Sequence, residues 1–141
     1  MRLARATGDY LRYKSAIGNM LSELAILITA REWSQDYEWH VHYPIALKVG
    51  IKREVADAIA GGRRPRGMSD DEEIVYDFSM ELHKNKAVSD ATYERTFKRF
   101  GHQGVVDLTG INAYYSLLAM HMNVARYQLP DDCKKLPRLP E

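Results

Sequence analysis

The chain has a single cysteine, Cys133, among its 141 residues. One cysteine excludes an intrachain disulfide and a Cys-x-x-Cys redox pair. A thiol peroxidase needs one thiolate that attacks the peroxide and a second thiol that resolves the oxidised product. The sequence therefore argues strongly against disulfide-based peroxidase chemistry.

Long apolar runs and an excess of one charge are also missing. No run approaches the roughly 18 apolar residues of a membrane-spanning helix, and no apolar signal core follows the opening Met-Arg-Leu-Ala-Arg. Lys and Arg total 20 against 19 Asp and Glu, which leaves a net charge of +1. No uniform field would attract a nucleic acid or a membrane surface. We expect a cytoplasmic protein with neither partner, and we interpret the basic stretch 63–67 as a solvated loop.

The alternation of apolar and polar residues that marks a strand is absent, whereas helical spacing recurs along the chain. We expect an all-α protein with one domain at 1–130 and an irregular, proline-containing tail at 131–141. Ser69 and Glu72 form a capping-box sequence, and Ser89 is a second N-cap. Gly101 should end the helix that Ser89 begins. The expected helices are 1–14, 20–33, 36–49, 51–60, 70–85, 90–100 and 103–127.

The last of these helices, 103–127, is apolar on almost all sides. A helix without a clear polar face is either central in its domain or part of a subunit interface. We therefore expect an oligomer rather than a monomer.

The most informative stretch runs from Glu38 to Gly50 and reads Glu-Trp-His-Val-His-Tyr-Pro-Ile-Ala-Leu-Lys-Val-Gly. Glu38 and His42 are four residues apart, so on a helix they share one face, where the carboxylate can orient the imidazole and raise its basicity. His40 lies roughly 200° from His42 around the helix, so the two histidines do not easily serve one site. The pair is either a solvated or packed contact or part of a proton-transfer site.

Three stretches resemble the carboxymuconolactone decarboxylase family, whose superfamily includes the AhpD-like alkylhydroperoxidases. They are 21–27 (Leu-Ser-Glu-Leu-Ala-Ile-Leu), 38–42 and 46–50 (Ala-Leu-Lys-Val-Gly). The resemblance covers residues 8–130 and includes Asn-Ala-Tyr-Tyr from Asn112 and the pair Met122-Asn123. It implies a helical bundle built on a central antiparallel helix pair. It also implies a homo-oligomer, a trimer or a hexamer, with active sites at or near subunit interfaces.

The AhpD-like branch carries a Cys-x-x-Cys pair, a histidine four residues after the second cysteine and a glutamate fifteen residues before it. By position, that histidine corresponds to His42 and that glutamate to Glu23. Gln35 and Glu38 occupy the two cysteine positions. The resemblance is therefore to the decarboxylase-type branch, which lacks the redox pair.

This branch implies a cofactor-free decarboxylation of a small unsaturated lactone or a related acid. Loss of carbon dioxide leaves a dienolate that must be stabilised and protonated. We assign the proton transfer to His42, with Glu38 or Glu23 orienting it. Arg31 is a candidate anchor for a substrate carboxylate, or else an ion-pair partner of Glu23 or Glu38.

The aromatic residues around this stretch are either packing residues or part of a substrate-binding wall. They are Trp33, Trp39 and Tyr43. A catalytic zinc commonly takes three protein ligands, and His40 lies away from the Glu38–His42 face, so we expect no metal and no cofactor. Histidines 83, 102 and 121 are scattered, and we expect each to be a surface or packed residue.

Three classes of function stay open. The first is a lyase that decarboxylates a small acid, and the second is an AhpD-like family member without redox cysteines. The third is a noncatalytic oligomer that binds a small apolar acid.

Overall fold

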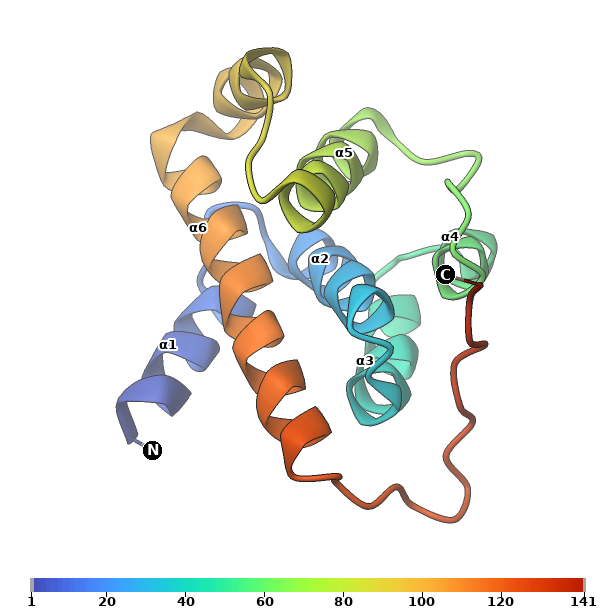
Figure 1. Cartoon of the computed structure of the whole chain (residues 1–141). Coiled ribbons are helices and arrows are strands. Elements are labelled where there is room, and N and C mark those ends of the chain that lie inside the picture. Colours follow the sequence, from blue (N-terminus) through green and yellow to red (C-terminus); the bar gives the residue numbers. More distant parts are fainter. Residues whose placement is uncertain (1, 141) are drawn as a thin grey trace.

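The computed structural model describes residues 2–140, and within that range its regular secondary structure is all α-helix (Figure 1). The helices are α1 (Arg2–Tyr13), α2 (Asn19–Glu32), α3 (Asp36–Lys48), α4 (Arg53–Ala60), α5 (Asp70–Asn85) and α6 (Asp90–Val124). The expected all-α class is confirmed, and the first five expected helices agree with α1 to α5 to within a few residues. Met1 and Glu141, which the sequence prediction includes in the first helix and the tail, lie outside the described residues. Within 2–140, no helix has the length and apolar character needed to cross a bilayer.

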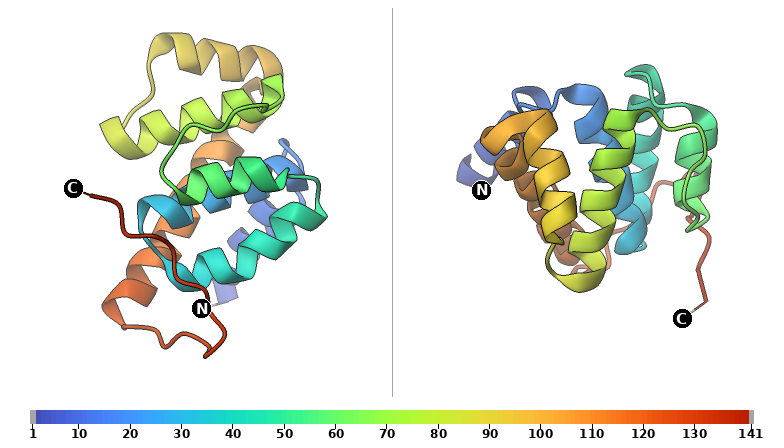
Figure 2. Two further views of the ribbon diagram at one scale, coloured as in Figure 1. Left: turned by 90° about the vertical axis from the view of Figure 1, so that its right-hand side faces the viewer. Right: turned by 90° about the horizontal axis from the view of Figure 1, so that it is seen from above.

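Helix α2 is the centre of the molecule. Its residues from Leu21 to Arg31 are all buried, because apolar side chains occupy every side of the helix rather than one stripe. It packs against α3, α5 and α6 and also against α1 and α4. Seen from above, α1 and α6 lie on one side of α2, and α3 and α4 lie on the other (Figure 2). The polar side chains between Leu21 and Arg31 are therefore held in the interior, and Glu23 is one of them.

The helix starts follow the capping residues that the sequence contains. The Ser69 hydroxyl accepts from the backbone N–H of Glu72, whose carboxylate in turn accepts from the N–H of Ser69, which confirms the capping box. Ser89 caps α6 in the same way by accepting from the N–H of Thr92. Local side-chain chemistry thus decides where α5 and α6 begin.

Gly101 interrupts α6. Its φ of +71° and ψ of −177° lie outside the helical region, and glycine adopts a positive φ without the steric cost that a Cβ imposes. The arm at 90–100 turns away from the long part of the helix at this point (Figure 1). The break expected at Gly101 is confirmed in the backbone angles, and it divides α6 into two helical arms.

The segment after α6 is irregular, as expected, yet it is held against the other helices. The Leu136 side chain is 4% exposed and belongs to the core. Its backbone N–H donates to a carboxylate oxygen of Asp36 over 2.8 Å, and Arg138 pairs with the other oxygen at 2.6 Å. Burial alone would raise the pKa of Asp36, but these two donors hold it below its usual value. Asp36, at the start of α3, therefore anchors the tail.

We expect Leu136→Ala to lower the free energy of unfolding by about 2–4 kcal/mol, because it leaves a cavity in the core. Denaturant unfolding followed by circular dichroism measures this loss. Leu3→Ala is the matched control, since Leu3 is 87% exposed and its loss should stay within about 0.5 kcal/mol. Equal losses in the two variants would show that the tail is not part of the cooperative fold.

Candidate functional site

Helix α3 carries two of the candidate catalytic residues on one buried face. Its N-cap is Gln35, whose side-chain oxygen accepts from the backbone N–H groups of Tyr37 and Glu38. Glu38 and His42 follow one turn apart, and both are buried, at 7% and 4% exposure. The Nε2 atom of His42 lies 3.3 Å from a carboxylate oxygen of Glu38. The spacing of four residues therefore produces the contact that the sequence predicts.

Helix α2 supplies the second carboxylate. Glu23 is 2% exposed, and one of its oxygens lies 2.7 Å from Nδ1 of His42. Each ring nitrogen of His42 thus faces a different carboxylate, one from α2 and one from α3. Both nitrogens can donate at once only in the protonated ring. The arrangement therefore favours the protonated form of His42.

The electrostatics of the site follow from this arrangement. Burial opposes the charged form of His42, but its interactions with Glu23 and then with Glu38 outweigh that cost and raise its pKa above the ordinary value. The proton on His42 is held more tightly than on a histidine in water. Such a group is suited to donate a proton as a general acid.

Sequence reasoning missed two residues that complete the site. Arg12 of α1 places its Nε atom 3.2 Å from the second oxygen of Glu23. The ring of Tyr115, on α6, meets the His42 ring edge-on at a centroid distance of 5.3 Å, and burial raises the pKa of its hydroxyl. One signal was available: a glutamate in the middle of an apolar helix needs a cation beside it.

A cavity of about 260 Å³ opens beside His42, between α1, α3 and α6. We call it the His42 cavity. It is lined by Arg5, Gly8, Asp9, Arg12, Tyr37, Glu38, Val41, His42, Tyr114, Tyr115 and Leu118. Glu38 and His42 face this cavity, whereas Glu23 is not among its lining residues. A small molecule in the cavity would therefore meet the imidazole, one carboxylate and the arginines of α1.

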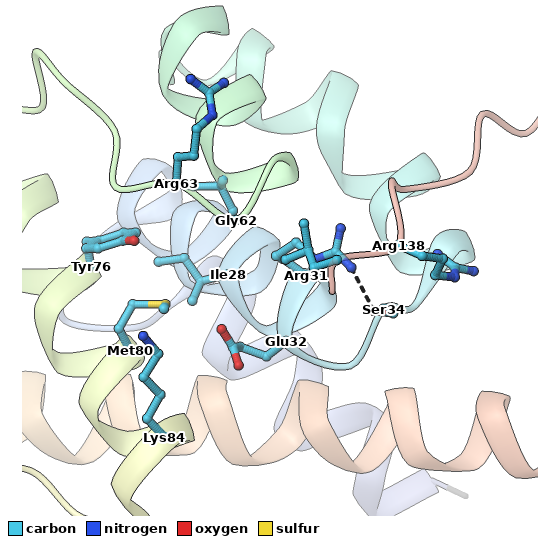
Figure 3. A pocket seen from close by; sticks show the side chains of 12 residues that line it. Ile28, Arg31, Glu32, Ser34, Gly62, Arg63, Tyr76, Met80, Lys84 and Arg138 are labelled. Carbon is cyan, nitrogen blue, oxygen red and sulfur yellow. Dashed lines mark hydrogen bonds between the residues drawn. The ribbon is translucent and has the colours of Figure 1, made fainter. Parts of the chain in front are cut away.

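Arg31 does not belong to this cavity. Its guanidinium donates to the carbonyl oxygens of Ala60 and Pro137. It also donates to the Ser34 hydroxyl (Figure 3). It lines a different cavity, between α2, α5 and the tail. The expected pairing of Arg31 with a glutamate of the site is wrong for Glu23, which pairs with Arg12 instead. Arg31 lies two turns beyond Glu23 on α2, so its side chain packs against the end of α4 and the tail, whose carbonyl oxygens accept its hydrogen bonds.

The three candidate aromatic residues also lie away from His42. Trp39 and Tyr43 line a groove of about 510 Å³ on the other side of α3, together with His40. Trp33 donates through its indole N–H to the hydroxyl of Ser116. Of the residues singled out from the sequence, the structure thus brings together Glu23, Glu38 and His42. It places Arg31 and the three aromatic residues elsewhere.

The Cys133 thiol contacts the backbone carbonyl of Asp36 at 3.8 Å, and burial raises its pKa, which disfavours a reactive thiolate. Among residues 2–140, no three His, Cys, Asp or Glu side chains converge as metal ligands do. The reason at the site is geometric: Glu23 and Glu38 contact opposite nitrogens of one ring.

The chain matches no model of a known protein family, and no curated protein matches it. The functional inference therefore depends on the residues of this site and on their geometry.

We expect His42→Gln to change how stability depends on pH. The folded-state pKa of His42 is raised, so its contribution to stability is fully present below the unfolded-state pKa, about 6.5, and is lost as pH rises through the folded-state value. The free energy of unfolding of the unsubstituted protein should therefore fall across that window, and this fall should be missing in His42→Gln. Denaturant titrations at a series of pH values measure both.

His102→Gln is the control for this experiment, because His102 is exposed on α6. It should keep the pH dependence of the unsubstituted protein. A His42→Gln variant with the same dependence would contradict the buried imidazolium.

Proposed function

We propose that the protein is a decarboxylase-type member of the carboxymuconolactone decarboxylase family. It would act as a cofactor-free lyase on a small unsaturated lactone or a related acid. The observation that carries the proposal is His42, a buried histidine held between two carboxylates at the wall of a small cavity. The motifs 21–27, 38–42 and 46–50 support the same family.

The reaction needs one proton and no redox partner. The bond between the substrate carboxylate and the ring carbon breaks, carbon dioxide leaves, and the electron pair spreads over the unsaturated lactone as a dienolate. A carbon of this anion then takes up a proton. The protonated form of His42 supplies that proton, and the raised pKa of the imidazole favours this form. Solvent reprotonates the histidine.

The two glutamates take different parts in this mechanism. Glu23 makes the shorter contact with His42, 2.7 Å against 3.3 Å, and does not line the cavity. It is a positioning residue that fixes the ring through Nδ1, as a carboxylate does for other catalytic histidines. Glu38 lines the cavity beside the second ring nitrogen. It orients the ring through Nε2, on the side from which the substrate would approach.

The cation that binds the substrate carboxylate comes from α1 in this proposal. Arg5 and Arg12 both line the His42 cavity, whereas Arg31 lines another one. A guanidinium matches the geometry of a carboxylate and pairs with it through two parallel hydrogen bonds. Arg12 already contacts Glu23 through Nε, so its terminal nitrogens are the groups that a substrate would use.

The test is an ultraviolet assay of γ-carboxymuconolactone consumption with parallel measurement of released carbon dioxide. We expect turnover by the purified protein, reduced about 10²- to 10⁴-fold in His42→Ala, because general acid catalysis contributes that much. His102→Ala, which removes an exposed histidine, should keep the full rate. Circular dichroism of each variant controls for folding.

An unchanged rate in a folded His42→Ala protein would overturn the role of His42. Absence of turnover by the unsubstituted, folded protein on this substrate and on related lactones would overturn the lyase proposal. It would favour a noncatalytic protein that binds small acids.

We propose further that the chain forms a homo-oligomer through α6. Its exposed apolar residues Val106, Leu117, Met120 and Val124 are 49%, 44%, 44% and 86% exposed. Their spacing places them on one side of the helix. Such a contiguous apolar face is typical of a surface that another subunit covers. The same helix lines the His42 cavity through its other side, so an interface here would lie close to the site.

We expect Leu117→Asp to shift the protein to a smaller assembly, because burying a carboxylate in an apolar interface is costly. Size-exclusion chromatography with light scattering measures the mass. Leu139→Asp is the matched control, since Leu139 has a similar exposure of 42% and lies on the tail. A monomeric unsubstituted protein, or equal masses for all three proteins, would contradict the interface.

A further inference from the structure

Arg31 is a buried cation that makes no ion pair with a carboxylate of residues 2–140. Its residue exposure is 5%, and its hydrogen bonds go to the uncharged acceptors of Ala60, Pro137 and Ser34. Its Nε atom is buried and has no hydrogen-bond partner among the described residues. Buried charges are normally paired with an opposite charge. The part of the chain that the structure describes therefore supplies no paired anion for this buried guanidinium.

The charges around Arg31 do not supply that anion. Burial and then the positive charge of Arg138 lower the pKa of Arg31, and the more distant charges of Glu32 and Asp36 offset this only in part. Arg138 is itself neutralised by Asp36. Glu32 is the nearest acid on α2, but it is exposed and makes no ion pair with Arg31 in the described part of the chain. Lys84, from the last turn of α5, adds a further positive charge.

Arg31, Lys84 and Arg138 line a cavity of about 350 Å³ between α2, α5 and the tail, which we call the Arg31 cavity (Figure 3). Its apolar wall is formed by Ile28, Tyr76, Met80 and Leu139. Lys84 and Glu32 extend toward it from neighbouring helices (Figure 3). The volume lies at the lower end of the range of about 300–1,000 Å³ for small-molecule pockets. The cavity thus combines an apolar wall with an excess of positive charge.

We propose that the Arg31 cavity is a binding site for a small organic anion, a carboxylate carried on a compact apolar body. The carboxylate would lie toward Arg31 and Lys84, and the apolar body would lie against Ile28, Tyr76 and Met80. Such a ligand would both neutralise the buried guanidinium and cover the apolar wall. An inorganic anion would only neutralise the guanidinium, and a neutral apolar molecule would only cover the wall.

The site is separate from the proposed reaction. The Arg31 cavity shares no lining residue with the His42 cavity. One of its walls is the tail, which Arg31 holds through the carbonyl of Pro137 and Asp36 holds through Arg138. A ligand here would therefore also contact the segment that closes over α2 and α4.

The experiment uses benzoate as the probe, with benzamide as its neutral counterpart of the same shape and inorganic phosphate as an anion without an apolar body. Isothermal titration calorimetry gives the affinities. Two-dimensional ¹H–¹⁵N NMR follows the Arg31 Nε–H signal, assigned by its disappearance in Arg31→Lys. We expect millimolar binding of benzoate, much weaker binding of benzamide and phosphate, and a shift of that signal with benzoate.

The variants separate this cavity from the catalytic one. Lys84→Met should weaken benzoate about tenfold, the usual value of a charge-assisted hydrogen bond. Lys98→Met, an exposed lysine on the far arm of α6, and His42→Ala should leave the affinity unchanged. Met80→Trp, which fills the cavity without removing a charge, should abolish binding.

Three results would overturn the proposal. They are benzamide binding as tightly as benzoate, phosphate binding as tightly as benzoate, and benzoate binding that is lost in His42→Ala but kept in Lys84→Met. The last result would assign the anion to the His42 cavity. Benzoate affinity tests this site and lactone turnover tests the proposed reaction. Because His42→Ala is measured in both experiments, a failure of one proposal can be told from a failure of the other.

Discussion

The contact on which the site depends is the buried one between His42 and Glu23. Helix α2 is surrounded by other helices, so the carboxylate of Glu23 cannot reach water and must find cations inside the protein. Its two partners are the imidazole of His42 on α3 and the guanidinium of Arg12 on α1. Removing one member would leave a buried charge without its partner, which is strongly destabilising. The pairing therefore ties three helices together and sets the protonation of the histidine.

A second buried charge organises the other end of α2. Arg31 and the neighbouring Asp36 hold the tail, one through a carbonyl oxygen and the other through an ion pair with Arg138. The tail in turn closes the Arg31 cavity and contributes Leu136 to the core. Helix α2 thus carries a buried carboxylate, Glu23, toward one end and a buried guanidinium, Arg31, at the other. The partners of both groups come from other segments of the chain.

This division changes the proposed mechanism from the one that the sequence suggested. An arginine on the same helix as Glu23 was the natural candidate for binding a substrate carboxylate. In the folded chain the cations beside His42 come from α1, and the aromatic residues of α3 face a separate groove. The proton-transfer residues could be named from motif spacing, but the residues that would hold the substrate could not.

The local properties of the fold follow from the amino-acid sequence alone. Helical periodicity, the caps at Ser69 and Ser89, the break at Gly101 and the contact between Glu38 and His42 all depend on neighbours within a few residues. Other contacts join residues that are farther apart in the sequence. Arg12 and Glu23 are 11 positions apart, His42 and Tyr115 are 73 apart, and Asp36 and Arg138 are 102 apart. No periodicity encodes such contacts, because they depend on how whole helices pack. Tertiary packing therefore decided which charges would be buried together, and with that which cavity each side chain would face.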